Sequence, residues 1–240
     1  MTMFDREALA QELDRRVGGP TSFGHLFYNE APQATLVMLP NKQQMRVPAA
    51  RAFLEMAIAA HREEGVNLLP AWVFRSHAFQ RDLFLKWAAR ASRGFEENVR
   101  HVAPTGYSEH HTGYGVDIHD GPGPRQVPGA PFEQRPAYAW LTARAADFDF
   151  ENSFPKDNVQ GVTFEPWHWR WVGDAHACET FRVVRQLVAA AVADPRVGAA
   201  FRRGGEGGVP PDAPADVRSL LTGLLEEHAE FLEDERARGG

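Results

Sequence analysis

The sequence predicts an α+β fold, with helices gathered towards both ends of the chain and short apolar strands between them. Three observations favour this class. Apolar residues recur at helical spacing near both ends, as in Leu9, Leu13 and Val17. The middle of the chain contains short runs such as "GVDI" and "WHWRW", whose β-branched and aromatic side chains are typical of strands. A length of 240 residues with 43% hydrophobic content suffices for one main domain with appendages.

The first half of the chain contains three predicted helices and one strand. The first helix covers residues 5–17 and stops at "GGP". The second begins at Pro48 and ends at Gly65, residues suited to those two positions. Its predicted buried face consists of Phe53, Leu54, Met56, Ala57 and Ala60. "VNLLPAWVFRS" follows as a strand, in which Pro70 indicates an edge position or a break. A third helix is predicted over residues 77–91.

The second half alternates strands with connections and then becomes helical. A short strand, "GVDI", precedes a Pro/Gly-rich connection over residues 122–136. A helix over residues 137–146 leads to "FDF" and then to "GVTFEPWHWRWVG", the expected central strand. After residue 175 the chain is helical again, and Asp194 and Pro195 can start a new helix. "RRGGEGGVPPDAP" has the composition of a flexible linker before a final amphipathic helix over residues 217–236, with Leu220, Leu221, Leu224, Leu225 and Phe231.

Charge and composition exclude several classes of function. The net charge is −6 and no block of Lys or Arg is present, so the electrostatic footprint of a nucleic-acid binder is missing. No run approaches the roughly 20 apolar residues that cross a membrane. The start of the chain carries acids at helical spacing and does not read as a signal peptide, which predicts a cytoplasmic protein, or a periplasmic one if an export signal has been removed. With one cysteine, Cys178, any metal must use His, Asp or Glu.

"EPWHWRW" is the first of three segments that can carry chemistry. On a strand, side chains alternate between faces, so Trp167, Trp169 and Trp171 would share a core face and His168 and Arg170 the opposite one. Pro166 allows a bulge or a strand start, which would let Glu165 swing towards His168. A carboxylate beside a metal-bound histidine can act as a general base, whereas a buried ion pair is the alternative.

The second segment, "SEHHTGYGVDIHD", covers residues 108–120 and offers more candidate ligands than one ion needs. A turn through its glycines could bring His110 and Asp117 onto one ion. Asp117 and His119 share a strand face, so these two residues could also be the ligand pair. Spacing alone does not decide whether His111 is a ligand. A solvated histidine-rich loop is the alternative to a metal site.

The third segment, "FRSHAFQ", places Arg75 at the end of an apolar strand, where its guanidinium could stabilise an oxyanion. Gln80, in the same segment, could hold a substrate backbone.

Taken in this order, the three segments resemble the zinc D-alanyl-D-alanine carboxypeptidases of the VanY type, a family that includes VanX-like D,D-dipeptidases. "FRSHAFQ" is similar to the family's Gly-Tyr-Arg-Ser-x-x-x-Gln element, "GYSEHHTGYGVDI" to Ser-x-His-x6-Asp, and "FEPWHWRWVG" to Glu-x-Trp-His. Similarity extends over residues 24–177. The resemblance implies a small antiparallel sheet that carries the zinc site and is flanked by helices, the hedgehog/DD-peptidase fold.

The resemblance also implies a role for individual residues. His110, Asp117 and His168 would hold one Zn²⁺, and Glu165 would take a proton from the attacking water and deliver it to the leaving amine. Arg75 would stabilise the oxyanion. The expected substrate contacts are Gln80, Ser108 and Tyr107, although Tyr107 could equally be a packing residue. One departure lies next to the arginine, where "WVF" at residues 72–74 replaces the family's small-Gly-aromatic approach and could reshape the pocket.

The expected domain organisation has three parts: residues 1–23 as helix and linker, 24–178 as the zinc peptidase, and 179–240 as a helical extension with a linker near 203–214. The leading hypothesis is a D,D-carboxypeptidase that acts on peptides ending in a D-amino acid. A cytoplasmic D,D-dipeptidase or biosynthetic peptidase and a non-catalytic zinc module are the alternatives. The last helices could cover the cleft, pack on the domain or form a homodimer.

Overall fold

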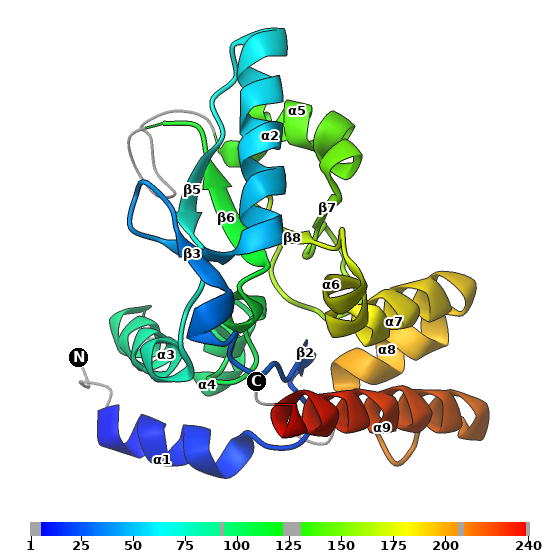
Figure 1. Ribbon diagram of the computed structural model, residues 1–240. Coiled ribbons are helices and arrows are strands. Elements are labelled where there is room, and N and C mark those ends of the chain that lie inside the picture. The colour runs from blue at the N-terminus through cyan, green and yellow to red at the C-terminus, as the bar shows by residue number, and fades with distance from the viewer. Residues whose placement is uncertain (1–5, 92–93, 122–130, 206–208, 239–240) are drawn as a thin grey trace.

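A four-stranded antiparallel sheet forms the centre of the molecule (Figure 1). The computed structural model describes residues 6–91, 94–121, 131–205 and 209–238. The sheet order is β5 (Leu69–Trp72), β6 (Gly115–His119), β8 (His168–Trp171) and β7 (Phe150–Asn152). Two hairpins complete the described strands, β1 (Thr21–Ser22) with β2 (His25–Leu26) and β3 (Leu36–Met38) with β4 (Gln44–Arg46). The predicted α+β class, with its small antiparallel sheet, is confirmed.

Helices surround this sheet and extend beyond it (Figure 1). The α-helices are α1 (Arg6–Arg16), α2 (Val47–Glu64), α3 (His77–Ala91), α4 (Phe95–Val99), α5 (Pro136–Arg144), α6 (Ala175–Thr180), α7 (Arg182–Ala193), α8 (Pro195–Arg203) and α9 (Ala215–Ala237). The 3₁₀ turns are η1 (Gln33–Thr35), η2 (Glu109–Thr112), η3 (Phe132–Gln134) and η4 (Ala145–Phe148). Within the described ranges, no helix has both the length and the apolarity that crossing a bilayer requires.

Strand alternation divides the sheet into an apolar face and a polar face. Val116 and Trp169 are register partners on the apolar face, where they join the core with Phe53 of α2. Asp117 and His168 are register partners on the opposite face. The predicted separation of tryptophans from His168 therefore holds within β8, but Trp167 precedes the strand and is only partly buried.

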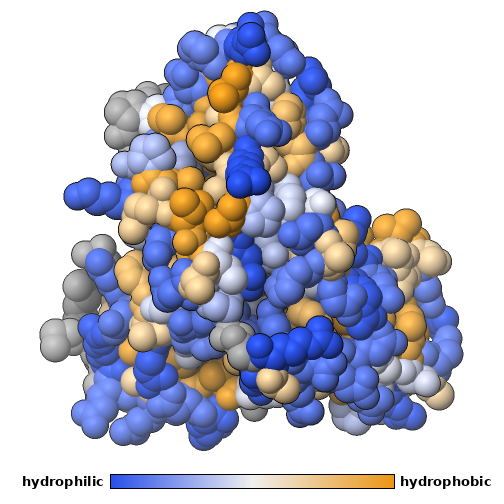
Figure 2. Space-filling view, viewed as in Figure 1, coloured by the Kyte–Doolittle hydropathy of each residue, from blue (hydrophilic) through white to orange (hydrophobic). Residues whose placement is uncertain are grey.

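Other local expectations are confirmed or corrected by the packing. Pro70 lies in the edge strand β5, next to a register shift, as its missing N–H predicted. Leu54 was expected in the core but is 48% exposed. It lies one residue, about 100°, from the buried Phe53 on α2, so it faces outwards. Leu54 is one of several exposed apolar residues of α2, with Val47 and Ile58, and Figure 2 shows apolar side chains on the outer surface along this helix. The strand expected at "FDF" starts only at Phe150, because η4 occupies residues 145–148.

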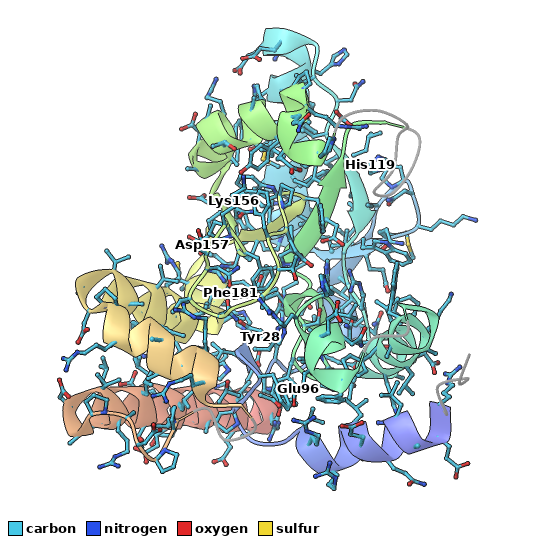
Figure 3. All side chains as sticks on the ribbon, turned by 180° about the vertical axis from the view of Figure 1, so that it is seen from behind. Tyr28, Glu96, His119, Lys156, Asp157 and Phe181 are labelled. Atoms are coloured by element: carbon cyan, nitrogen blue, oxygen red, sulfur yellow. The ribbon has the colours of Figure 1, made fainter. Side chains whose placement is uncertain are left out.

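The C-terminal helices pack into the same core as the sheet. Phe181 lies beside Tyr28, with ring centroids 5.7 Å apart (Figure 3). His228 of α9 donates from Nε2 to the Phe27 carbonyl at 2.7 Å. Leu221 of α9 is buried in the main core cluster. Part of the predicted linker, residues 206–208, and most of the connection at 122–136, residues 122–130, lie outside the described residues. The domain boundaries and the homodimer stay predictions.

Shortening Leu221 tests the contribution of α9 to the core. Leu221 is 1% exposed and Leu220 is 42% exposed, although both lie on the same helix. Leu221→Ala is expected to lower the free energy of unfolding by about 2–5 kcal/mol through cavity formation. Leu220→Ala, the matched control, is expected to change it by less than about 0.5 kcal/mol. Chemical denaturation measures both, and equal effects of the two variants would contradict this packing.

Candidate metal centre and active site

Asp117 and His168 form the centre of the site because β6 and β8 place them opposite one another. Directly opposed residues in an antiparallel pair have Cβ atoms about 5 Å apart, within reach of a polar contact. The contact is made: His168 Nδ1 lies 2.9 Å from Asp117 Oδ1. Both side chains are almost fully buried.

His110 reaches the same carboxylate from the turn η2. Its Nε2 lies 3.3 Å from Asp117 Oδ1. Ser108 starts this turn by accepting a hydrogen bond from the His110 N–H, and Gly113 ends it with a φ of 70°. Ligand atoms of His110, Asp117 and His168 all lie within 4.8 Å of one another, which makes them the one potential metal-binding group of three or more among the described residues.

Hydrogen bonds behind the two histidines determine which ring nitrogens face this group. His110 Nδ1 lies 2.7 Å from the Val73 carbonyl and must donate to it, which leaves Nε2 as the potential ligand atom. His168 Nε2 lies 3.0 Å from Glu109 Oε2, which leaves Nδ1 for a metal. Such partners fix the orientation of metal-binding histidines and increase their basicity.

Glu109 is a functional residue that the sequence analysis missed. Glu109 Oε1 accepts a hydrogen bond from Arg170 at 2.7 Å. Ser153 donates to Oε2, the oxygen that also contacts His168. Burial opposes ionisation of Glu109, but Arg170 and His168 outweigh it and lower the pKa to about 2. The sequence indicated only that a carboxylate was needed, because Arg170 shares the strand face of His168 and a buried cation requires an acidic partner; it did not indicate which one.

The charges of the metal-free group have physical causes that can be traced. Burial lowers the pKa of His168, but hydrogen bonds from its two nitrogens to Asp117 and Glu109 raise it to about 10. Burial and the nearby Arg75 lower the pKa of His110 to about 4. Burial opposes ionisation of Asp117, yet His110 and His168 keep its pKa well below the usual range.

Arg75 approaches Asp117 from the other side, directly after β5. Its Nη2 lies 3.1 Å from Asp117 Oδ2, and Nη1 donates to Gln80 Oε1 at 3.1 Å. Gln80 in turn donates to the Ala103 carbonyl at 2.7 Å. Gln80 therefore positions the guanidinium, while the substrate contact predicted for it stays a prediction. Ser76, which follows Arg75, accepts from the Phe79 N–H at the start of α3.

One narrow cavity, about 50 Å³ in volume, brings all the predicted site residues together: Arg75, Gln80, Tyr107, Ser108, His110, Asp117, Glu165 and His168. Glu165 belongs to a turn before β8, where its carbonyl accepts from the His168 N–H at 3.1 Å and from Asn152 at 3.0 Å. Tyr107 is buried and donates its hydroxyl to the Gly19 carbonyl at 3.0 Å, so it packs as well as lines the cavity.

The structure also separates the two candidate ligands that spacing alone left open. His111 uses both ring nitrogens, since Nδ1 lies 2.6 Å from the Arg75 carbonyl and Nε2 accepts from the Gly106 N–H. His119 is paired with Leu69 at the far end of β6 (Figure 3). Neither belongs to the group formed by His110, Asp117 and His168.

The residues present fit a single zinc ion. Two histidines and one carboxylate are a donor set typical of catalytic zinc, with a fourth position left for water or substrate. Both histidines have their other nitrogen fixed by a buried acceptor. Zinc binding would displace the proton that His168 Nδ1 shares with Asp117. Fold and site thus define a protein with a buried candidate site for one metal ion inside a small cavity.

Comparison with known proteins agrees with this class. The family model "VanY: D-alanyl-D-alanine carboxypeptidase" matches residues 42–174, more than half of the chain. The chain therefore belongs to the VanY family. A D-alanyl-D-alanine carboxypeptidase of Enterococcus faecalis is 30% identical over 130 residues, which cover 50% of this chain and 46% of that protein. One from Enterococcus faecium is 30% identical over 84 residues, 34% of this chain and 25% of that protein. The chain spans less than half the length of these curated relatives.

Solved structures share the fold. VanYB in complex with D-alanine-D-alanine has a TM-score of 0.51 and 24% identity, covering 70% of this chain and 90% of that one. A VanY from a VanB-type resistance cassette in complex with Zn(II) has a TM-score of 0.50 and 23% identity, and the match covers 69% of this chain and 95% of that one. The LD-carboxypeptidase LdcB has a TM-score of 0.51 and 27% identity, and the match covers 62% of this chain and 72% of that one.

Acid titration tests the role assigned to Glu109. A carboxylate whose pKa falls from 4.5 to about 2 on folding stabilises the protein above pH ~4.5 and loses this contribution as the pH falls towards 2. The contribution is on the order of 3 kcal/mol. In zinc-free protein, Glu109→Gln is therefore expected to be clearly less stable than the unmodified chain at pH 6, and the gap should narrow by pH 3.

Urea unfolding across this pH range measures the gap. Glu55→Gln, at an exposed position on α2, provides the matched control and should leave a small and constant difference. A gap for Glu109→Gln that does not change with pH would show that Glu109 is not held as a carboxylate.

Proposed function

We propose that the protein is a zinc-dependent D,D-carboxypeptidase that removes the terminal D-alanine from peptidoglycan-type peptides. The observation that carries the proposal is the buried group of His110, Asp117 and His168 in one cavity with Glu165 and Arg75. Membership of the VanY family and the D-alanine-D-alanine bound to the structural neighbour VanYB support the same substrate class.

Glu165 is the proton carrier of the proposed reaction. When bound, zinc supplies Lewis acidity, which lowers the pKa of water and polarises a carbonyl. Glu165 lines the same cavity as the three ligands and can take the proton of the attacking water. The same carboxyl group then gives the proton to the amine that leaves. A structural zinc site would require no such residue.

Arg75 stabilises the negative charge that develops on the carbonyl oxygen. Its guanidinium is buried, and Asp117 and Gln80 hold it in place, so it does not need to reorganise during the reaction. The cavity beside it is narrow, about 50 Å³, which favours a terminal residue with a side chain as small as a methyl group. Trp72 contacts the Arg75 guanidinium at 5.7 Å but does not line this cavity, so the predicted effect of residues 72–74 on the pocket would act through Arg75.

An L,D-carboxypeptidase is the second candidate, because LdcB is the most similar in sequence of the three structures compared above. The chemistry at zinc would be the same, and only the configuration of the penultimate residue would differ. The D,D-dipeptidase and the cytoplasmic location stay predictions. Hydrolysis assays with one substrate for each of these three activities can distinguish the D,D-carboxypeptidase, the L,D-carboxypeptidase and the D,D-dipeptidase.

Hydrolysis by the zinc-loaded protein provides the direct test. Release of D-alanine is expected from a pentapeptide ending in D-Ala-D-Ala, with slower or no cleavage of a tetrapeptide ending in L-Xaa-D-Ala or of free D-Ala-D-Ala. A chelator should abolish activity, and added zinc should restore it. Faster cleavage of the tetrapeptide or the dipeptide would replace the proposal with the corresponding alternative.

Replacing the base tests the mechanism. Glu165→Ala is expected to retain one zinc per chain and to lose about 10²–10⁴ in kcat, the usual contribution of a general base. The exposed Glu55→Gln serves as control and should keep the full rate. Metal analysis and kcat are measured on the same preparations. An unchanged kcat in Glu165→Ala would rule out this mechanism.

A further inference from the structure

His25 is a buried histidine in the wall of the catalytic cavity that neither the metal group nor the proton transfer uses. It lies on β2, is 3% exposed, and shares the cavity lining with His110, Asp117 and Glu165. A histidine buried beside a reaction centre needs a polar partner for each ring nitrogen, or else a ligand that supplies one.

One nitrogen of His25 has its partner within the protein. Nε2 lies 2.8 Å from the Val99 carbonyl, which can only accept, so Nε2 carries the hydrogen. Burial lowers the pKa of His25, which keeps the ring neutral at pH 7. In a neutral ring with a hydrogen on Nε2, Nδ1 is a hydrogen-bond acceptor. Within the described ranges, no protein group pairs with Nδ1, and His25 lines the cavity.

The backbone before His25 is built to hold this orientation. Phe23 and Gly24 form the β1–β2 turn with positive φ values of 51° and 84°. A Cβ atom at Gly24 would lie 2.0 Å from the Gln160 carbonyl oxygen, so only glycine fits there. Gln160 donates to the Gly24 carbonyl at 2.9 Å, and Thr21 donates to the His25 carbonyl at 2.9 Å. Strained and heavily constrained turns of this kind cluster at functional sites.

The substrate offers few groups that can meet this acceptor. The two substrate residues nearest the metal group would be those on either side of the cleaved bond, the terminal residue and the residue that supplies the scissile carbonyl. These two residues carry two N–H groups. The nitrogen of the scissile bond receives the proton from Glu165, so the N–H of the penultimate residue is the one left to bind the protein.

We propose that His25 Nδ1 accepts a hydrogen bond from the N–H of the penultimate substrate residue and so selects peptides over esters at that position. This inference rests on the proposed carboxypeptidase function. A site that holds a buried acceptor for a substrate N–H discriminates against an analogue without it, because the acceptor is then left unpaired.

Two matched peptides test the proposal with the zinc-loaded full chain. One ends in D-Ala-D-Ala, and in the other D-lactate replaces the penultimate residue, so that an oxygen stands in place of the N–H while the scissile amide is unchanged. The unmodified protein is expected to prefer the first by about 10- to 100-fold in kcat/KM. His25→Phe keeps the ring volume and should reduce the preference to within about twofold.

Controls separate this inference from the general function. Val102→Ala, at an apolar position in the same cavity wall, should keep the preference. Binding of both peptides to zinc-loaded Glu165→Ala, measured by calorimetry, gives the same ratio without turnover. If the unmodified protein cleaves neither peptide, the proposed function is wrong, and the calorimetric ratio still decides the role of His25. Equal affinity for both peptides in the chain with His25 intact, or an undiminished preference in His25→Phe, would overturn the proposal.

Discussion

The pairing of Asp117 with His168 across β6 and β8 is the contact on which the rest of the site depends. The strand register places the two side chains face to face, 2.9 Å apart, on the polar side of the sheet. The opposite side is filled by Val116 and Trp169, whose burial fixes that register, because a slip of one residue would turn every side chain to the wrong face. The apolar core therefore determines where the proposed metal ligands Asp117 and His168 lie, and His110 and Arg75 only have to approach a carboxylate that is already fixed.

Burying so many ionisable groups requires that each charge be matched. Glu109 and Arg170 form a buried ion pair directly behind His168, and their ionisation also orients the imidazole. Removing one member of such a pair typically costs about 3–5 kcal/mol, because its partner is left uncompensated. The pair holds Nε2 of His168 on the Glu109 side, so that Nδ1 faces Asp117. The same reasoning applies to His110, which the Val73 carbonyl orients from behind.

Much of this arrangement could be predicted from the sequence, and the remainder depends on contacts between distant segments. Helical periodicity, Pro70 and the alternation in "WHWRW" identified the class of fold and the polar face. Spacing alone left His111 and His119 as rival ligands, and only the turn η2 and the strand register exclude them. Glu109 was missed because its partner Arg170 is 61 residues away, a separation that carries no periodic signal. Leu54 was misplaced because an apolar residue does not reveal which side of a helix it occupies when its neighbour Phe53 is apolar too.

We propose that this chain orients two histidine nitrogens and one carboxylate for a single zinc ion. A crystal structure of the zinc-loaded protein, with anomalous data at the zinc edge, measures this directly. We expect one zinc per chain, bound by His110 Nε2, His168 Nδ1 and a carboxylate oxygen of Asp117, with nitrogen distances of about 2.0–2.1 Å. The His168 Nε2–Glu109 contact should persist. Zinc bound through the other nitrogen of either histidine, or by His111 or His119, would contradict this assignment of ligands.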